Sequence, residues 1–324
     1  MKERVLLTGA SGFIGFHIIE ALLTAGYDVT AVVRKSSKVE HLSEFAIQYT
    51  DLDFNSVDAL KDNIAQNNYN YVIHAAGVTS ALTPADYNYF NTTYTVNLAQ
   101  AAANSGVRFV FLSSLAAIGP LKDLNGQITE ATPPAPVTYY GESKLRAETE
   151  IREIEGLTYV ILRPTAVYGP RERGIFIMFK QLTRGIELYI GRKPQQLSFI
   201  YCKDLADVVI KSLKQGSGGY NLSDGNAYDR NKLAEISKDV LHLRTLRINL
   251  PMALVKLIAL AADKISYLTK KPAPLNTDKL NELAATNWNC SIDKARKDLD
   301  FAPRFDLYKG VKETLLWYKK ENWI

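Results

Sequence analysis

The sequence has 324 residues, and its 47% hydrophobic and 23% charged content is typical of a folded globular protein and excludes a disordered or collagen-like chain. This length predicts two lobes, or one large α/β unit with an insertion. The net charge of +5 reflects 39 basic and 34 acidic residues spread along the chain. We therefore expect no nucleic-acid partner, whereas small anionic ligands fit this charge.

No metal site, export signal or membrane span is predicted. Cys202 and Cys290 lack C-x-x-C spacing and a nearby histidine, so neither a disulfide framework nor a metal site is expected. The first apolar run ends at Thr8-Gly9, too early for a signal peptide, and a cytoplasmic protein is predicted. Residues 250–262 are apolar but fall short of the ~18–20 residues that span a bilayer. We expect a packed amphipathic helix there, with a membrane-surface helix as the alternative.

Short apolar runs alternate with helical patterns over the first 170 residues. The patterns predict strands at residues 4–8, 28–33, 70–74, 107–112 and 158–163, and helices at 13–25, 91–105 and from about 140. Strands separated by helices of this length require right-handed β-α-β crossovers. The predicted fold class is therefore α/β, a Rossmann-type doubly wound parallel sheet.

The pattern changes beyond residue 170. We predict a Rossmann domain over residues 1–170, to which residues 196–222 return, and a smaller C-terminal α/β substrate lobe over 171–324. Residues 119–138 lack periodicity and contain several prolines, which indicates a long functional loop.

The first predicted strand is followed by three glycines at intervals of three residues. Gly9 would permit a tight turn, Gly12 would let the backbone approach a pyrophosphate, and Gly15 would let the next helix pack on the strand. The helix N-terminus would then offer free N–H groups to the anion. This position, at the first strand-to-helix turn of a parallel α/β chain, predicts a dinucleotide site.

The end of the second strand should meet the adenosine ribose of the cofactor. Arg34 stands where an acidic residue would accept a hydrogen bond from the ribose of NAD, and Lys35 and Lys38 follow. A guanidinium pairs well with a 2′-phosphate, so NADP is favoured and NAD is the alternative. A solvated basic turn would explain the same residues. Asp51-Leu52, after the third strand, is placed to meet the adenine edge.

Tyr140 and Lys144 lie four residues apart, and this spacing puts both side chains on one face of a helix. A neighbouring ammonium is expected to lower the pKa of the phenol, and a positive nicotinamide would add to this. Tyr140 could then exchange a proton with a substrate oxygen while a hydride moves to or from the cofactor. A Tyr/Lys pair by itself is also common on protein surfaces.

Five motifs occur together in a set order. They are the glycine triplet, Val72-Ile73-His74-Ala75-Ala76-Gly77, Phe111-Leu112-Ser113-Ser114, Tyr140-x-x-x-Lys144, and the run from Leu162 to Pro170. Together they closely resemble the extended short-chain dehydrogenase/reductase family, the NAD(P)-dependent epimerase/dehydratase group. The resemblance covers about residues 1–215 and, more loosely, the C-terminal lobe.

This resemblance implies Tyr140 as the acid/base, Lys144 as its pKa modulator and ribose contact, and Ser114 as the hydroxyl that orients the substrate oxygen. If the motif is shifted by one residue, Ser113 takes this role in place of Ser114. Asn91 resembles an asparagine that supports the proton relay, although a helix-capping role is equally compatible. His74 is expected to be a packed, hydrogen-bonded residue. The residues expected to contact the cofactor are Gly9, Ser11, Gly12, Phe13, Ile14, Gly15, Arg34, Lys38, Asp51, Leu52, Ala75, Ala76, Gly77, Tyr140, Lys144, Pro164, Thr165 and Val167.

Departures from the family pattern bear on the reaction. Dehydratases that resemble this chain place an Asp-Glu pair after the active-site hydroxyl, where this chain has Leu115-Ala116, so dehydration is disfavoured. Many nucleotide-sugar epimerases carry an arginine that clamps the substrate diphosphate at the position of Leu197. Arg171, Arg173 and Arg192 could substitute for it.

The resemblance is nearest to dihydroflavonol-4-reductases and 3β-hydroxysteroid dehydrogenase-like proteins. It implies an NAD(P)-dependent carbonyl reductase or alcohol dehydrogenase that acts on a small molecule with a carbonyl or secondary alcohol. The alternative is a nucleotide-sugar 4-epimerase that retains NAD, and a less favoured hypothesis is a non-catalytic NADP-sensing protein. A homodimer through the helices at 91–105 and 140–155 is a further family expectation.

Overall fold

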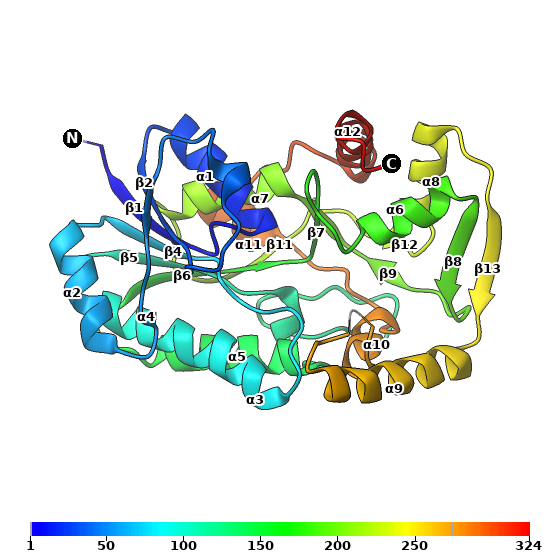
Figure 1. The fold of residues 1–324 in the computed structure, drawn as a ribbon, viewed down its shortest axis with the longest axis horizontal. Coiled ribbons are helices and arrows are strands. Elements are labelled where there is room, and N and C mark those ends of the chain that lie inside the picture. Colours follow the sequence, from blue (N-terminus) through cyan, green and yellow to red (C-terminus); the bar gives the residue numbers. More distant parts are fainter. Residues whose placement is uncertain (1, 274) are drawn as a thin grey trace.

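The computed structural model describes residues 2–273 and 275–324, and its central feature is a seven-stranded parallel sheet (Figure 1). The strand order is β11-β6-β5-β4-β1-β2-β3. These strands are β1 (Arg4–Thr8), β2 (Asp28–Val32), β3 (Gln48–Thr50), β4 (Tyr71–His74), β5 (Arg108–Leu112), β6 (Thr158–Pro164) and β11 (Gly218–Leu222). All neighbouring pairs run parallel, which confirms the predicted Rossmann-type α/β class.

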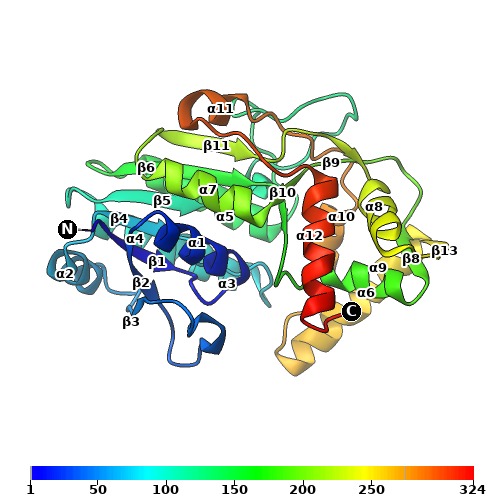
Figure 2. The same ribbon diagram turned by 90° about the horizontal axis from the view of Figure 1, so that it is seen from above.

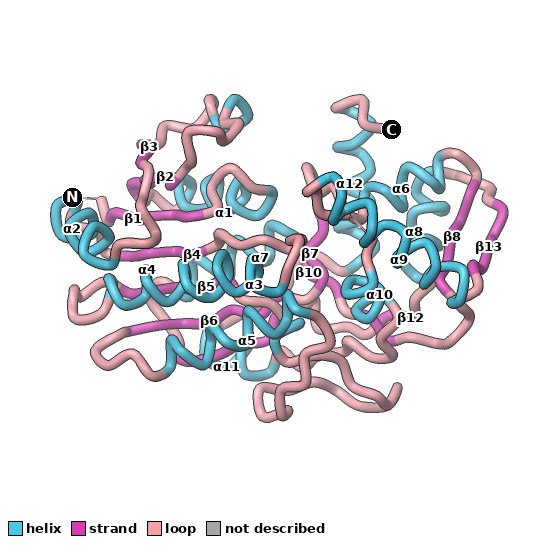
Figure 3. Tube along the Cα trace, turned by 60° about the horizontal axis from the view of Figure 1, so that its bottom comes forward, coloured by secondary structure: helices cyan, strands magenta, loops and turns pink. Residues whose placement is uncertain are grey.

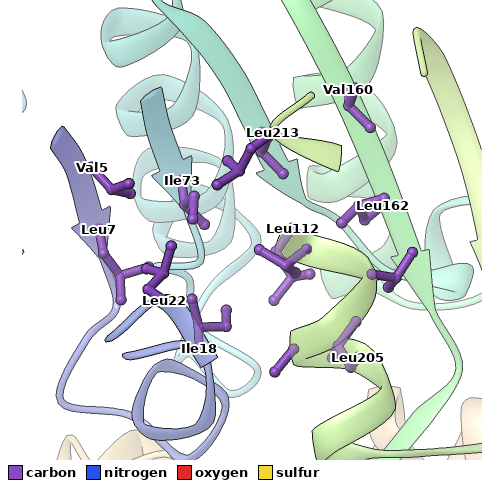
Figure 4. Close-up of a cluster of buried hydrophobic side chains, with 14 of the residues drawn as sticks. Val5, Leu7, Ile18, Leu22, Ile73, Leu112, Val160, Leu162, Leu205 and Leu213 are labelled. Atoms are coloured by element: carbon purple, nitrogen blue, oxygen red, sulfur yellow. The ribbon is translucent and has the colours of Figure 1, made fainter. Parts of the chain in front are cut away.

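Helices cover both faces of this sheet (Figure 1). One face carries α1 (Phe13–Thr24), α7 (Cys202–Ser212) and α11 (Asp293–Leu299), and the other carries α2 (Val57–Asn67), α4 (Tyr94–Ala102) and α5 (Tyr139–Arg152). Because successive side chains of a strand point to opposite faces, Val5 and Leu7 pack under α1 while Leu6 packs on the other side. Figure 4 shows the α1 and α7 side, where Ile18 and Leu205 meet the strands.

The region before α4 differs from the predicted continuous helix at 91–105. A short helix α3 (Pro84–Tyr87) begins at Thr83, whose hydroxyl accepts a hydrogen bond from the Asp86 N–H. A π-helical segment (Asn88–Thr93) then leads directly into α4. The sequence signal for this earlier start is the Thr-Pro-x-Asp capping box, which the apolar periodicity does not reveal.

A second group of elements lies beside the sheet (Figure 2). Its strands pair as β7 (Ala166–Tyr168) with β10 (Phe199–Tyr201), β8 (Ile186–Ile190) with β13 (Leu246–Leu250), and β9 (Gln196–Leu197) with β12 (Tyr228–Asp229). Its helices are α6 (Phe176–Thr183), α8 (Lys232–Leu241), α9 (Met252–Thr269), α10 (Thr277–Leu283) and α12 (Leu307–Lys320). Aromatic side chains, including Tyr168, Phe179 and Tyr318, form much of its core.

The chain crosses between the two groups more than once. After β10, the helix α7 packs beside α1 and β11 joins the large sheet next to β6. The segment from Ile292 to Phe301 also packs in the core of the large sheet, because Ile292, Leu299 and Phe301 face it. Residues far apart in sequence therefore build one core.

Tertiary contacts hold the long loop that follows the 3₁₀ turn Leu115–Ala117. The Asn287 side-chain amide donates to the Asp123 carbonyl at 2.7 Å and to the Gly126 carbonyl at 2.8 Å. Isolated bridges join Leu121 to Asn287 and Ile128 to Cys290. The loop is thus attached to the C-terminal segment as well as to its own base, where the Ala135 N–H donates to the Ile118 carbonyl at 2.7 Å.

Candidate active site

The carboxyl ends of the parallel strands bring most of the predicted site residues to one edge of the large sheet. In-register pairing aligns Thr8 with His74, His74 with Phe111, and Leu112 with Leu162. The segments that leave these strand ends are the glycine loop, the turn at Arg34, the loop Ala75-Ala76-Gly77, the pair Ser113-Ser114, and Thr165. Ligands of open α/β sheets bind at this edge, where the strand order reverses between β1 and β4.

The glycine loop has the shape of an anion cradle. Gly9 has a φ of +72°, and a Cβ there would lie 2.6 Å from the Ala75 backbone. A Cβ on Gly15 would lie 2.2 Å from the Gly9 carbonyl oxygen. A Cβ on Gly12, by contrast, would meet only the Gly9 oxygen at 3.2 Å among the described residues other than its chain neighbours, so its outer side is open. The first turn of α1 has neither a side-chain cap nor an acidic residue, and this fits a bound pyrophosphate.

The end of β6 offers a second feature that fits a bound cofactor. The Thr165 hydroxyl oxygen is buried and has no hydrogen-bond partner within the described residues. Its backbone N–H donates to the Leu222 carbonyl at 2.9 Å, which fixes the residue beside Pro164. Because buried polar groups are normally paired, this hydroxyl is suited to pair with a polar group of a ligand at this edge.

Arg34 lies just beyond β2, at the same edge as the glycine loop. The Arg34 carbonyl accepts from the Ser37 N–H at 2.8 Å, and the Ser37 hydroxyl accepts from the Arg34 N–H at 3.1 Å. This turn leaves the side chains of Arg34 and Lys38 exposed. Asp51 is exposed beyond β3, whereas Leu52 packs partly into the core. The Arg34 guanidinium is therefore accessible to a 2′-phosphate and to solvent.

Helix α5 brings Tyr140 close to Ser114, the predicted substrate-orienting serine. Thr138 caps this helix by accepting from the Gly141 N–H at 3.1 Å. A Cβ on Gly141 would lie 2.3 Å from the Ala116 carbonyl oxygen, so the helix start packs tightly on the turn Leu115–Ala117. The Tyr140 phenol consequently lies close to the Ser114 hydroxyl, which acts to lower the pKa of the phenol.

The phenol of Tyr140 holds its proton near neutral pH. Burial raises its pKa to about 12, and the nearby Glu282 and Tyr87 raise it further, against the lowering effect of the Ser114 hydrogen bond. This direction is opposite to the lowering that the Tyr140–Lys144 spacing predicts. The reason is that desolvation of the phenolate outweighs the hydrogen bond that favours it.

Lys144 lies beneath the loop that follows β4. Its side chain is only 3% exposed, and its ammonium donates to the Leu112 carbonyl at 3.1 Å and lies 4.8 Å from the centre of the Phe111 ring. A Cβ on Gly77 would come within 3.1 Å of the Lys144 Nζ. Burial lowers the pKa of this ammonium to about 8.

Substitution of Lys144 by methionine should raise the stability of the protein at pH 7 but lower its affinity for the cofactor. At pH 7 the buried charge costs stability, because the pKa falls from 10.5 to about 8 on folding, and the variant should be more stable by about 2–3 kcal/mol. This gain should shrink as the pH rises from 8 towards 10.5, where the folded wild-type lysine is already neutral. Urea denaturation at pH 7 and pH 10 checks this expectation, while cofactor affinity should fall. A less stable variant at pH 7 would contradict the buried charge.

The two adjacent serines have different partners. Ser113 donates its hydroxyl proton to the buried Glu148 carboxylate at 2.6 Å, and the same carboxylate pairs with Arg163 at 2.6 Å. Ser114 instead accepts from the Ala116 N–H at 3.2 Å and meets Tyr140. The geometry therefore favours Ser114 over Ser113 as the hydroxyl beside the substrate.

Sequence analysis missed the ion pair of Glu148 and Arg163. Both side chains are buried, and they join α5 to β6 directly below the site. A signal was present, because Arg163 ends an otherwise apolar strand and Glu148 lies four residues beyond Lys144 on the same helix face. A charge inside an apolar strand requires a partner.

Asn91 lies within the π-helical segment and does not cap a helix. Its amide oxygen accepts from the Val78 N–H at 2.8 Å, and its amide nitrogen donates to the Val78 carbonyl at 3.0 Å and to the Ser143 hydroxyl at 3.0 Å. The fully buried side chain thus ties the loop after Gly77 to α5. A π-helical turn at this place is typical of functional sites.

His74 is a packed residue, as expected. Its ring nitrogens are hydrogen-bonded to Thr8 at 2.8 Å and to Thr95 at 2.9 Å. Burial lowers the pKa of the ring to about 3, so the imidazole stays neutral. The Thr8 hydroxyl also accepts from the Ala76 N–H at 3.1 Å, and the ring therefore helps to hold the cofactor loop.

Helix α10 covers the start of α5, which the sequence does not predict. The Asp278 carboxylate accepts from the Tyr139 N–H at 3.0 Å, and the Asn281 amide donates to the Val137 carbonyl at 3.3 Å. A groove of about 330 Å³ runs between the two helices. Because Glu282 lies near Tyr140, the C-terminal elements border the start of α5 around the candidate site.

The candidate diphosphate-binding arginines lie in two places. Arg171 stacks on Phe16 of α1 with its guanidinium carbon 4.0 Å from the ring centre, and Arg173 lies near Trp323. Arg192 lines a pocket of about 440 Å³ together with Arg230 and Arg247. Leu197 pairs with Tyr228, and the next residue along the chain, Asp229, lines this pocket.

Comparison with known proteins identifies the class. A profile described as "NAD dependent epimerase/dehydratase family" matches residues 5–223, and the chain belongs to that family. It is therefore an enzyme of the extended short-chain dehydrogenase/reductase type, as the five motifs predict. None of the helices in the described parts of the chain is long and apolar enough to cross a membrane.

Individual relatives differ in their reactions. The chain is 26% identical to the ceramide reductase of Caulobacter vibrioides, over 99% of this chain and 96% of that protein. It is 25% identical to the UDP-glucose 4-epimerase of Vibrio cholerae, over 99% and 97% of the two chains. The fold matches the crystal structure of Bordetella bronchiseptica WbmG in complex with NAD and UDP, with a TM-score of 0.79, 20% identity, and coverage of 99% and 96%.

Proposed function

We propose that this enzyme transfers a hydride between C4 of a bound nicotinamide cofactor and a substrate carbon that alternates between secondary alcohol and ketone. The observation that carries this proposal is the proximity of the protonated Tyr140 phenol to Ser114, with the buried Lys144 one turn further along α5. When bound, the cofactor would supply or accept the hydride and would add positive charge beside the phenol.

The residues of the site have separate tasks in this proposal. Tyr140 holds the proton at its phenolic oxygen and donates it to a ketone oxygen, or accepts it from an alcohol. Ser114 orients that oxygen, and Lys144 contacts the ribose from below Gly77. Asn91 keeps the loop at Val78 in place. The glycine loop and the Thr165 hydroxyl hold the two ends of the cofactor.

The first candidate reaction is 4-epimerisation of a nucleotide sugar with NAD retained. The similarities to the Vibrio cholerae epimerase and to WbmG in complex with NAD and UDP support this alternative better than a reductase. Arg192, Arg230 and Arg247 line one pocket of the second group of elements, and such a set of guanidinium groups suits a phosphate-bearing ligand.

The second candidate is a carbonyl reductase or alcohol dehydrogenase that releases its cofactor. Leu197 cannot bind a diphosphate, and Leu115 and Ala116 supply no second acid or base for dehydration. The similarity to a ceramide reductase supports reduction of an apolar substrate. The choice between the two candidates depends on the cofactor that is bound and on whether it leaves.

Replacement of Arg34 by alanine tests the NADP preference. If Arg34 binds the 2′-phosphate, the Kd for NADPH should rise about tenfold or more, whereas the Kd for NADH should change less than about twofold. Fluorescence titration of the cofactor-stripped protein measures both values. Lys35→Ala is the matched control, and equal effects on the two cofactors would favour a solvated turn.

Substrate assays separate the two reactions. An epimerase should interconvert UDP-glucose and UDP-galactose without net NAD(P)H formation, and its cofactor should resist stripping. A reductase should oxidise NADPH in proportion to the ketone that is consumed. Absence of both activities over UDP-sugars and a panel of ketones would contradict the proposed hydride transfer.

A further inference from the structure

Helix α9 presents an apolar face to solvent. Leu254, Leu257, Ala261, Ile265 and Leu268 recur at intervals of three and four residues, which places them along one side of the helix. Their large side chains, with Ile258, Leu260 and Tyr267 beside them, are 44% to 84% exposed. A continuous exposed stripe of this kind differs from scattered surface leucines and indicates an interaction surface.

The opposite side of α9 is narrow and packs only locally. Val255 and Ala259 are its buried residues, and they contact Leu280 of α10 with Leu250 and Ile190 of the neighbouring strands. This cluster is separate from the cores of the large sheet and of the aromatic group. The helix is thus attached along one edge, and its wider apolar face remains uncovered in the described chain.

The charges on and beside this helix are mainly basic. Lys256, Lys264, Lys270 and Lys271 are all exposed. The one acidic residue of α9, Asp263, is partly buried and accepts hydrogen bonds from Thr277, at 3.2 Å from its N–H and 2.8 Å from its hydroxyl. An apolar face bordered by lysines is complementary to an anionic lipid surface, where aliphatic side chains enter the bilayer and ammonium groups reach the headgroups.

The position of α9 connects this face to the active site. Figure 1 shows α9 along the lower edge of the molecule with α10 beside it, and Figure 3 turns this edge towards the reader. Helix α10 in turn bonds to the start of α5 through Asp278 and Tyr139, one residue from Tyr140. A surface that holds α9 would therefore lie next to the entrance of the candidate active site.

We propose that α9 is a membrane-surface helix that docks the enzyme on an anionic bilayer, with its leucine and isoleucine stripe in the interfacial region and its lysines on the phosphate groups. The helix lies on the bilayer and does not cross it, in agreement with its limited length and apolar content. The inference stands on the surface of α9 and holds for either candidate reaction.

A second copy of this chain is a less suitable occupant of the same face. Two α9 helices packed against each other would bring lysines of one copy near lysines of the other, and the single carboxylate of the helix is already engaged by Thr277. Like charges would then oppose the apolar contact. An anionic surface meets the same lysines with opposite charge.

Vesicle flotation of the full chain tests the proposal. The wild type should bind vesicles of phosphatidylcholine with about 30% phosphatidylglycerol, and bind pure phosphatidylcholine vesicles several times less. Raising the salt from about 50 to 500 mM should weaken the binding severalfold, because electrostatic attraction to the surface is screened. The double variant Leu257→Gln/Leu268→Gln should lower the bound fraction at least about fivefold.

Two controls make the result specific. Leu316→Gln changes a leucine on α12 that is 55% exposed, against 64% for Leu257 and 80% for Leu268. Helix α12 lies on the opposite side of the molecule in Figure 1, so this variant should leave vesicle binding unchanged. The α9 variant should keep the cofactor affinity and thermal midpoint of the wild type. Absence of vesicle binding, or binding that the α9 variant retains, would overturn the proposal. A wild-type dimer that the same variant converts to a monomer, without vesicle binding, would assign the face to a second copy instead.

Discussion

Replacing Tyr140 by phenylalanine should lower kcat by about 10³-fold or more while the Kd for the nicotinamide cofactor changes less than about threefold. The phenol is the group that holds a proton beside Ser114 near neutral pH, and its removal leaves the substrate oxygen without a proton donor. The ring itself remains, so packing at the start of α5 should persist. Steady-state kinetics and cofactor titration of the same preparation measure the two quantities.

The matched control for this prediction is Tyr139→Phe. Tyr139 is the neighbouring residue of α5, but it is 45% exposed and lies about 100° round the helix from Tyr140. Its variant should keep kcat within about threefold of the wild type. If the Tyr140 variant kept its turnover, or if both variants lost it equally, Tyr140 would not be the acid/base.

Replacing Glu148 by alanine should destabilise the protein by about 3–5 kcal/mol, the cost of leaving a buried charge without its partner. The carboxylate is fully buried and bonds to Arg163, to Arg152 and to the Ser113 hydroxyl. Its loss would leave the Arg163 guanidinium, itself 4% exposed, in an apolar strand. Urea denaturation of the two proteins measures the change in the free energy of unfolding.

Two further variants show whether burial causes this loss. Glu150→Ala removes an exposed ion pair with Arg146 on the same helix, four residues apart like Glu148 and Arg152. This variant should cost less than about 0.5 kcal/mol of stability. The double variant Glu148→Leu/Arg163→Met should recover most of the stability, because it removes both buried charges. A small effect of Glu148→Ala, comparable to that of Glu150→Ala, would contradict this account of the Glu148–Arg163 pair.

Features that depend on local spacing could be predicted from the amino-acid sequence alone. Alternating strands and helices predicted the parallel sheet, because a β-α-β connection has one favoured hand and buries both faces of its strands. The three glycines located the anion cradle, since only a residue without a side chain fits at Gly9 and Gly15. The ordered motifs identified the family, which the profile match over residues 5–223 confirms.

Other features depend on burial and on contacts between distant residues, and only the folded structure shows them. The pKa of Tyr140 follows from desolvation and from Glu282, which lies 142 residues further along the chain, so the helical spacing to Lys144 could not predict its direction. The distinction between Ser113 and Ser114 required the position of Glu148. The apolar pattern of α9 predicted a helix, but only its narrow contact with Leu280 shows that the wider face remains in solvent. Hydrophobic periodicity predicts which residues share one face of a helix, but the packing partners of that face depend on the tertiary fold.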